Sequence, residues 1–355
     1  MNVGIVTLYD FFNHGNRLQN YALEKTLKNL GHKPLSLAIA SKRWLPFCYG
    51  LTRIFPFIST TRRLIRSMKF TKIDLNSKNI TNIGFKKLKK YFDENLDCVI
   101  VGSDQVFNPA YILDSDKMFL RFAPKERRIA YSASFGISAL PERYNNDFIC
   151  GLNDMNYISI RENEGAKIVK DLTKKDVPVV VDPTMLLCKE DWEAFVEDVP
   201  EKRIPKHKYL LTYFLGPEKE YKQKVKEIAE HFGLKIININ TLGDKYFDVD
   251  SKVFVSLIKN ATLVCTNSFH GHALSIILEK PLVSFPSVKS KNSRIKTLLQ
   301  LAGLEQRHYE RLKYEDMLSL DYSDVRERVD VQRQKGLGFL KEAFSKIEKV
   351  DEDKR

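Results

Sequence analysis

Short apolar runs alternate along most of the chain with longer segments in which apolar residues recur every three or four positions. In the first half, this pattern predicts strands at residues 3–8, 33–38, 98–102, 128–134, 157–160 and 177–181. Their nearly continuous apolar character is typical of strands that are covered on both faces of a parallel sheet. A helix predicted at residues 17–30 ends before Gly31 and completes the first βα unit.

A second βα series follows a polar segment that contains Pro200 and Pro205. Its predicted strands are residues 209–214, 235–240, 261–265 and 281–285, and its predicted helices are residues 218–232, 253–259 and 272–279. The sequence therefore predicts an α/β protein with two Rossmann-like parallel-sheet lobes and an interlobe cleft. The expected division is a first lobe at 1–196, a linker at 197–208, a second lobe at 209–329, and a C-terminal helix at 330–355 that braces the first lobe.

Length and composition add limits to this picture. A chain of 355 residues is too long for one ordinary core, so two domains are expected. The 58 basic and 45 acidic residues leave a net charge of +13, which indicates an anionic partner such as a phosphorylated metabolite, nucleic acid or a membrane surface. The five cysteines form no CxxC pair, so neither a zinc cluster nor a disulfide framework is expected. No signal-peptide pattern and no apolar run of about 20 residues occur, so we expect a cytoplasmic protein.

Polar residues follow three of the predicted strands in the first half. After the first strand, Gly15 permits close backbone approach, and Asn16 either meets a ligand or caps the next helix. After the strand that ends at residue 102 come Ser103 and Asp104, and Asp104 either orients or deprotonates a substrate hydroxyl or caps a helix. Arg161 follows another strand and offers paired donors to phosphate or carboxylate, or else forms a salt bridge with a nearby glutamate. The dinucleotide motif GxGxxG is absent.

In the second half, the strand at 261–265 leads into the segment TNSFHGH, residues 266–272. A strand that ends at a small-residue turn before a helix places that turn at the carboxyl edge of the sheet, where open α/β folds bind ligands. Imidazole titrates nearest neutrality, so His270 is a candidate acid/base, with Ser268 and His272 as candidate substrate contacts. The alternative is a pair of core histidines. Because the two histidines are two residues apart, they do not share a helix face as in HExxH, and no metal is expected.

Six segments occur in order along the chain, at residues 13–22 (NHGNRLQNYA), 101–109 (VGSDQVFNP), 130–136 (AYSASFG), 159–162 (SIRE), 181–184 (VDPT) and 266–271 (TNSFHG). Together they resemble the polysaccharide pyruvyl transferase family, from residue 3 to about residue 307. The resemblance implies a two-lobed fold similar to that of GT-B glycosyltransferases. It also implies exopolysaccharide biosynthesis: transfer of a pyruvate ketal group from phosphoenolpyruvate to a sugar of a cell-surface glycan or its lipid-linked precursor, with no cofactor. Arg161 matches the arginine that meets the donor, and His270 matches the histidine of the second lobe.

The sequence departs from this family pattern at Phe269. Family members that form ketals tend to carry a basic residue within the matching segment, so the donor site here is one cation short unless Arg294 or His272 supplies it. Arg294 lies in a basic loop, which either contacts phosphate or is simply solvated.

The chemistry of ketal formation agrees with the residues present. It needs cations for the phosphate and carboxylate of the donor, a proton for the methylene carbon, and the removal of a proton from each attacking hydroxyl. We expect Arg161 to bind the donor, His270 to act as the acid/base or on the phosphate side, and Asp104 to orient an acceptor hydroxyl. The alternative is a nucleotide-sugar-dependent glycosyltransferase on the same fold. A nucleic-acid-binding protein would not account for polar motifs at strand ends in both halves, so no nucleic acid is expected.

Residues 25–72 contain eleven lysines and arginines and no aspartate or glutamate. Aromatic residues are interleaved with these charges in a predicted insertion at 41–72, a pattern that suits the interface of an anionic membrane. The alternative is an insertion whose aromatic residues pack on the first lobe. A lipid-linked acceptor would bring the protein to the inner face of the cell membrane, and removal of Arg62, Arg63 and Arg66 would test for such contact.

Overall fold

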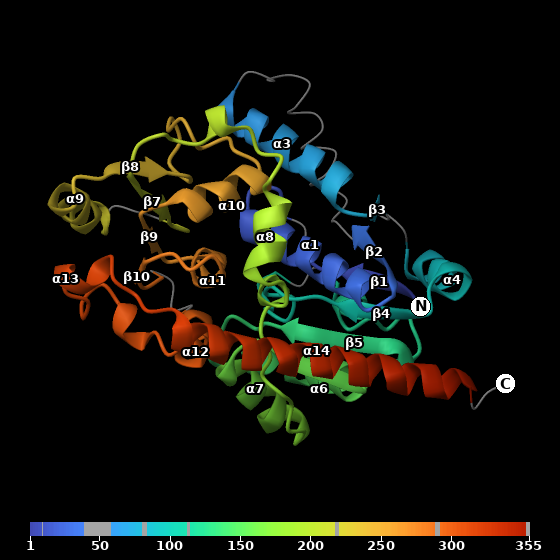
Figure 1. Cartoon of the computed structure of the whole chain (residues 1–355). Helices are drawn as coiled ribbons and strands as arrows, with labels where there is room; N and C mark the ends of the chain where they lie inside the picture. Colours follow the sequence, from blue (N-terminus) through green and yellow to red (C-terminus); the bar gives the residue numbers. More distant parts are fainter. Residues whose placement is uncertain are drawn as a thin grey trace.

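The computed structural model describes residues 1–8, 10–38, 58–79, 84–111, 114–216, 220–287 and 292–352. Residues 41–57 of the predicted basic insertion lie outside this described part, as do Lys289 and Lys291 of the basic loop before Arg294. The chain forms two parallel sheets, the first on the right of Figure 1 and the second on the left, with helices packed around each. The predicted α/β fold with two parallel-sheet lobes is confirmed.

The first sheet has six strands in the order β3-β2-β1-β4-β5-β6, and each pairs in parallel with its neighbour. The strands are β1 (Asn2–Val6), β2 (Lys33–Ala38), β3 (Ser77–Asn79), β4 (Cys98–Val101), β5 (Arg128–Ala133) and β6 (Tyr157–Ile160). Strand order reverses between β1 and β4, where Val3 pairs with Pro34 on one side and with Cys98 on the other. In open α/β sheets, ligands bind beyond the carboxyl ends of the strands at such a reversal.

The helices of the first half cover both faces of this sheet (Figure 1). They are α1 (His14–Asn29), α3 (Ser59–Asp74), α4 (Phe85–Asn95), α5 (Ser115–Met118), α6 (Asn145–Asn153), α7 (Asn163–Thr173) and α8 (Lys189–Phe195), with a short 3₁₀ turn η3 (Pro183–Met185). Residues 177–181 do not form the predicted strand: only Val179 makes an isolated bridge, with Ile160. Pro178 lacks the N–H that a regular ladder requires, which accounts for the break.

The second sheet has four parallel strands in the order β10-β9-β7-β8. They are β7 (Tyr209–Tyr213), β8 (Lys235–Asn238), β9 (Leu263–Thr266) and β10 (Leu282–Ser284). Its helices are α9 (Lys222–His231), α10 (Ser251–Asn260), α11 (Phe269–Ile277), α12 (Ser293–Ala302) and α13 (Tyr314–Met317). Because α11 begins shortly after β9, the polar residues between them and in the first turn of α11 lie at the interface between the lobes.

The last helix, α14 (Ser323–Glu352), runs from the second lobe back across the first, along the lower side of Figure 1. It begins at Ser323, earlier than the predicted position 330, and packs on the first lobe through ring contacts of Phe339 with Tyr131 and of Phe344 with His32. Arg333 Nε donates to the carbonyl oxygen of Met185 at 3.1 Å. These contacts join the end of the chain to the first lobe, while the predicted lobe boundaries themselves stay predictions.

Candidate active site

The loops that follow β4 and β6 and the N-terminal turns of α1 and α11 meet at one buried carboxylate, Asp182. Its Oδ2 atom accepts a hydrogen bond from Ser103 Oγ at 2.6 Å and forms an ion pair with Arg161 Nη1 at 2.8 Å. His270 Nε2, from the second lobe, lies 3.6 Å from the same oxygen. Asp182 therefore connects three residues that the sequence singled out separately.

The other oxygen of Asp182 fixes the turn that follows it. Oδ1 accepts from the backbone N–H of Thr184 at 2.9 Å and from its hydroxyl at 2.7 Å. Burial would raise the pKa of this carboxyl, but His270, Arg161 and the Ser103 hydroxyl together hold the pKa well below its usual value. Asp182 is thus an anion in the folded protein. Sequence reasoning assigned it no role, although it lies in one of the six recognised segments and directly follows an apolar run.

Asp104 adopts a left-handed backbone conformation, with φ of 72°. Its Oδ2 accepts from Asn16 Nδ2 at 2.7 Å, and its Oδ1 accepts from the backbone N–H of Gln105 at 2.8 Å. It caps no helix, because the next one, α5, begins only at Ser115. Burial raises the pKa of Asp104, yet the charges of Arg161, His270 and Arg294 and the bond from Asn16 outweigh burial and lower it.

Asn16 is not the helix cap that the sequence allowed. Asn13 caps α1 instead, with its side chain accepting from the backbone N–H of Asn16 at 3.3 Å. The Oδ1 atom of Asn16 accepts from the backbone N–H of Asp10 at 3.0 Å and from Arg17 Nε at 3.1 Å. With its Nδ2 donating to Asp104, Asn16 is held on both sides and faces the same cluster as Asp104.

Arg161 is 2% exposed and pairs with Asp182, not with the nearby Glu162 or Glu164. Its Nε and Nη2 atoms have no hydrogen-bond partner in the described part of the chain. Phe269 stacks on the guanidinium, whose Cζ lies 4.4 Å from the ring centroid. Phe269, which departs from the family pattern, therefore covers one face of the Arg161 guanidinium across the lobe interface.

Glu162 forms a separate buried acceptor beside this arginine. Its Oε1 accepts from the Ser134 hydroxyl at 3.1 Å and from the backbone N–H groups of Phe135 and Gly136 at 2.8 and 3.1 Å. From the sequence, Glu162 was considered only as a partner for Arg161. Its role as an acceptor for the backbone of the segment 130–136 was indicated only by the presence of that segment among the six shared with the family.

Arg294 lies in the first turn of α12, so it does not belong to a solvated loop. Its Nε has no hydrogen-bond partner among the residues that the structure describes. Burial, and next the positive charge of Arg161, lower the pKa of Arg294 to about 10. Two guanidinium groups with unsatisfied donors therefore lie close enough to repel one another, and an anion between them would remove the conflict.

His270 approaches the first lobe at Gly15, in the first turn of α1. A Cβ atom built on Gly15 would overlap the His270 ring, so only glycine leaves room for the imidazole. The Nε2 atom of His270 has no hydrogen-bond partner within the described ranges, apart from facing Asp182 at 3.6 Å. His270 thus reaches the carboxylate cluster of the first lobe from the second lobe.

His272 and Ser268 support α11 from within the second lobe. The two ring nitrogens of His272 lie 2.7 Å from the Ser268 carbonyl oxygen and 2.8 Å from Ser284 Oγ. Burial lowers the pKa of His272 to about 4, so the ring is neutral at physiological pH. Ser268 caps α11 by accepting from the backbone N–H of Gly271 at 3.4 Å. Both nitrogens of His272 are therefore engaged, which leaves Arg294 as the candidate for the additional donor cation.

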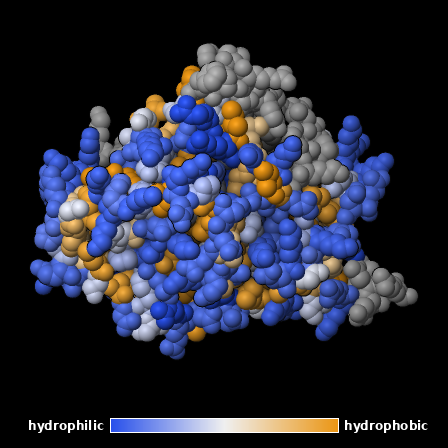
Figure 2. Space-filling model, turned by 45° about the horizontal axis from the view of Figure 1, so that its top comes forward, coloured by the Kyte–Doolittle hydropathy of each residue, from blue (hydrophilic) through white to orange (hydrophobic). Residues whose placement is uncertain are grey.

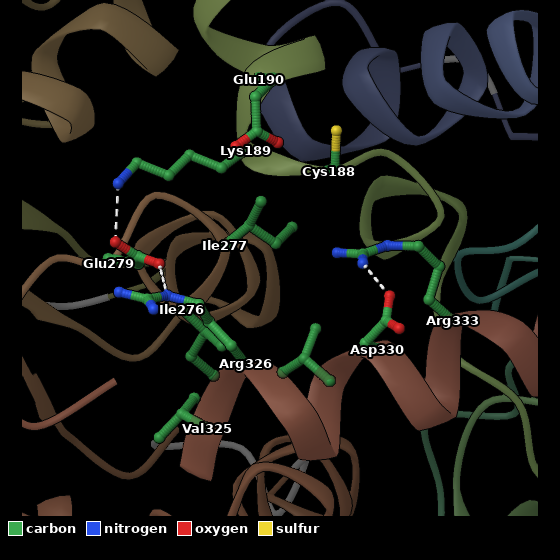
Figure 3. A pocket seen from close by; sticks show the side chains of 11 residues that line it. Cys188, Lys189, Glu190, Ile276, Ile277, Glu279, Val325, Arg326, Asp330 and Arg333 are labelled. Carbon is green, nitrogen blue, oxygen red and sulfur yellow. Dashed lines mark hydrogen bonds and ion pairs between the residues drawn. The ribbon is translucent and has the colours of Figure 1, made fainter. Parts of the chain in front are cut away.

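A cavity of about 450 Å³ lies apart from this cluster, between α8, the end of α11 and α14 (Figure 3). Five of the six charged side chains that line it are paired with one another: Lys189 with Glu279 at 2.6 Å, Arg326 also with Glu279, and Arg333 with Asp330 at 2.7 Å. None of the candidate site residues lines it. Among the described residues, no three His, Cys, Asp or Glu side chains are placed to hold a metal ion, and no helix has the length and apolar character to cross a membrane.

Comparison with known proteins decides the family. The model of the polysaccharide pyruvyl transferase family matches residues 13–287, which is more than half of the chain. This chain belongs to the polysaccharide pyruvyl transferase family. The predicted membership is confirmed, and with it the prediction that the protein is a transferase. A search of curated proteins finds no significant match.

Solved structures agree with the fold of this pyruvyl transferase family member. A putative UDP-N-acetylglucosamine 2-epimerase from Listeria monocytogenes matches with a TM-score of 0.58, at 11% identity over 97% of each chain. The UDP-GlcNAc 2-epimerase from Neisseria meningitidis, bound to UDP-GlcNAc, matches with a TM-score of 0.52, at 12% identity over 94% of this chain and 100% of that chain. At these identities the likeness concerns the two-lobed GT-B-like architecture alone.

Proposed function

We propose that this family member transfers a pyruvyl group from phosphoenolpyruvate to two hydroxyls of a sugar, in a cell-surface polysaccharide or its lipid-linked precursor. The observation that carries the proposal is the pair of guanidinium groups with unsatisfied donors, Arg161 and Arg294. Phosphoenolpyruvate carries two anionic groups, a phosphate and a carboxylate, and so matches two neighbouring cations. Arg161 already pairs with Asp182, but its Nε and Nη2 and the Nε of Arg294 lack acceptors, and a dianionic donor would supply them.

The reaction assigns a task to each group around the donor. Both hydroxyl oxygens bond to the central carbon of the donor, whose bond to the phosphate oxygen breaks. One hydroxyl proton ends on the methylene carbon, which becomes a methyl group, and the other leaves with the phosphate. We assign Asp104, oriented by Asn16, as the base for a hydroxyl of the acceptor, and His270 as the group that serves the phosphate side or delivers the proton. The Arg161 and Arg294 cations stabilise the charge that develops on the leaving group.

Phe269 fits this arrangement without a basic residue in its segment. It stacks on Arg161, and Arg294 enters from α12 with an unsatisfied Nε. The proposed donor site therefore contains two arginines, one from each lobe, and the aromatic ring excludes water from one face of the first. A lipid-linked acceptor would place the enzyme at the inner face of the cell membrane.

A binding experiment tests the donor. We expect phosphoenolpyruvate to raise the melting temperature by several degrees at saturating concentration, because a ligand at 100 times its Kd adds about 2.7 kcal/mol of stability. Arg294→Gln should abolish most of this shift, while Arg311→Gln, a matched change at an exposed arginine, should retain it. If a UDP-sugar stabilises the protein and phosphoenolpyruvate does not, the donor assignment is wrong and the glycosyltransferase alternative stands.

A further inference from the structure

The outward face of α3 combines aliphatic and cationic side chains. Five residues lie along one side of this helix, Arg62, Ile65, Lys69, Lys72 and Ile73, and Ile58 precedes its first turn as the N-cap residue. Three large aliphatic residues on it are solvent-exposed, Ile58 by 49%, Ile65 by 39% and Ile73 by 65%. In the upper part of Figure 2, around α3, hydrophobic patches alternate with strongly hydrophilic surface. Single exposed isoleucines are ordinary, but three on one face of a helix beside lysines indicate a partner.

The opposite side of α3 is fixed to both lobes. Leu64 packs with Phe11, and Arg63 donates to the carbonyl oxygen of Phe12 at 2.6 Å and to Asn240 Oδ1 of the second lobe at 2.9 Å. The sequence grouped Arg62, Arg63 and Arg66 as candidate membrane contacts, but Arg63 is buried in this interface. Removing all three would damage the lobe interface and would not isolate membrane binding.

Arg62 and Arg66 are also engaged with the second lobe. Both pair with Asp248, Arg62 through Nε at 2.5 Å and Arg66 through Nη1 at 2.6 Å. Lys69 and Lys72 instead are exposed and have no ion pair in the portion of the chain that the structure describes. The free charges of the outward face are therefore these two lysines, which lie between Ile65 and Ile73.

We propose that the outward face of α3 docks on an anionic lipid bilayer, with its isoleucines entering the headgroup region and Lys69 and Lys72 meeting lipid phosphates. Aliphatic side chains gain free energy at a bilayer interface, and lysines are attracted to its negative surface. A nucleic acid would attract the lysines but would gain nothing from the isoleucines. Complementarity of both charge and hydrophobicity therefore favours the lipid surface.

The position of α3 links this membrane contact to the candidate site. Its inner side packs on residues 10–13, and the backbone of Asp10 in that loop holds Asn16 of the candidate site. An enzyme docked through α3 has its acceptor-side residues next to the bilayer. This last step rests on the proposed function, whereas the docking itself does not depend on the donor or acceptor.

Co-sedimentation with vesicles tests the docking surface, without donor or acceptor. The full-length protein is mixed with phosphatidylcholine vesicles, with or without phosphatidylglycerol, and compared with the variant Ile65→Gln/Lys69→Gln/Lys72→Gln/Ile73→Gln. A control carries equivalent exposed changes elsewhere: Lys86→Gln, Lys87→Gln, Leu242→Gln and Val331→Gln. All eight positions have exposed side chains, so both variants should keep the melting temperature of the wild type.

We expect the wild type and the control to sediment with the anionic vesicles only. The α3 variant should show a partition coefficient lower by roughly 30-fold or more, from the loss of two lysines at about fivefold each together with two isoleucines. The proposal is overturned if the wild type ignores anionic vesicles or if the α3 variant binds them equally well. If the α3 variant loses binding to nucleic acid but still binds the vesicles, the outward face of α3 is a nucleic-acid surface and the proposal is wrong. Failure of phosphoenolpyruvate to bind would leave these outcomes unaffected.

Discussion

At the scale of single residues, Asp182 organises the candidate site. It joins Ser103 and Arg161 of the first lobe to His270 of the second through a single oxygen atom. A buried arginine needs an anionic partner, and an imidazole that faces a carboxylate is held in one orientation. Asp182 is therefore a positioning residue in the proposed reaction, since it acts through Arg161 and His270.

We expect Asp182→Asn to lower the free energy of unfolding by about 3 kcal/mol at pH 7, because Arg161 is left buried without its anion. The folded-state pKa of Asp182 lies below the unfolded value of about 3.9, so its contribution is complete above that pH and is lost as the pH falls through the folded pKa. The difference between variant and wild type in urea denaturation should therefore shrink only in the acid range. Asp93→Asn removes an exposed partner of Lys89 and should change little. An equally small effect at Asp182 would contradict the role.

The positions of strands and site residues were predictable because the carboxyl ends of parallel strands share one edge of a sheet. Asn16, Asp104 and Arg161 follow different strands and meet as this rule requires. The role of Asp182 was not predictable, since it depends on contacts to residues 79 and 21 positions away and the preceding run resembled a strand. Likewise, no local pattern shows that His270 would face Asp182.

At the scale of elements, α11 illustrates why a helix boundary decides a side chain's role. The sequence predicted its start at His272, but Ser268 caps the helix and α11 starts at Phe269. His270 therefore lies in the first helical turn facing the other lobe, and His272 lies against Ser284 of β10. A carbonyl oxygen only accepts, so His272 Nδ1 donates to Ser268 and Nε2 accepts the Ser284 hydroxyl.

His272 should make stability depend on pH. Its pKa is about 4 in the folded protein and about 6.5 when unfolded, so the unfolded chain binds a proton first as the pH falls. As the pH falls from the unfolded to the folded pKa, the contribution of His272 to the free energy of unfolding therefore decreases by about 1.4 kcal/mol per pH unit. His272→Gln does not titrate, and denaturant titrations across this range should show a shallower slope by about that amount. A double-mutant cycle with Ser284→Ala measures the hydrogen bond itself, and an unchanged slope in His272→Gln would refute this account.

At the scale of the whole molecule, the two lobes are held together by contacts on several sides. His14 of the first lobe stacks on Phe254 of the second, with ring centroids 4.8 Å apart. On another side, Asp248 binds α3, and α14 packs across the first lobe. The candidate site lies within this interface, because His270, Phe269 and Arg294 come from the second lobe and their partners from the first. Changes in the distance between the lobes therefore change the site.

Gly15 offers a direct test of this dependence. An added Cβ would overlap the His270 ring, so we expect Gly15→Ala to push α1 and α11 apart at the site. The overlap should lower stability by about 1 to 3 kcal/mol and reduce pyruvyl transfer. Gly338→Ala, in α14, is the matched control, because its Cβ would meet nothing within 4 Å and alanine favours a helix by about 0.5 to 1 kcal/mol. If Gly15→Ala is as stable and active as this control, His270 does not need its observed position, and the interlobe assembly of the site is wrong. Hydrogen exchange at α11 amides, faster in Gly15→Ala and unchanged in Gly338→Ala, would locate the effect at the interface.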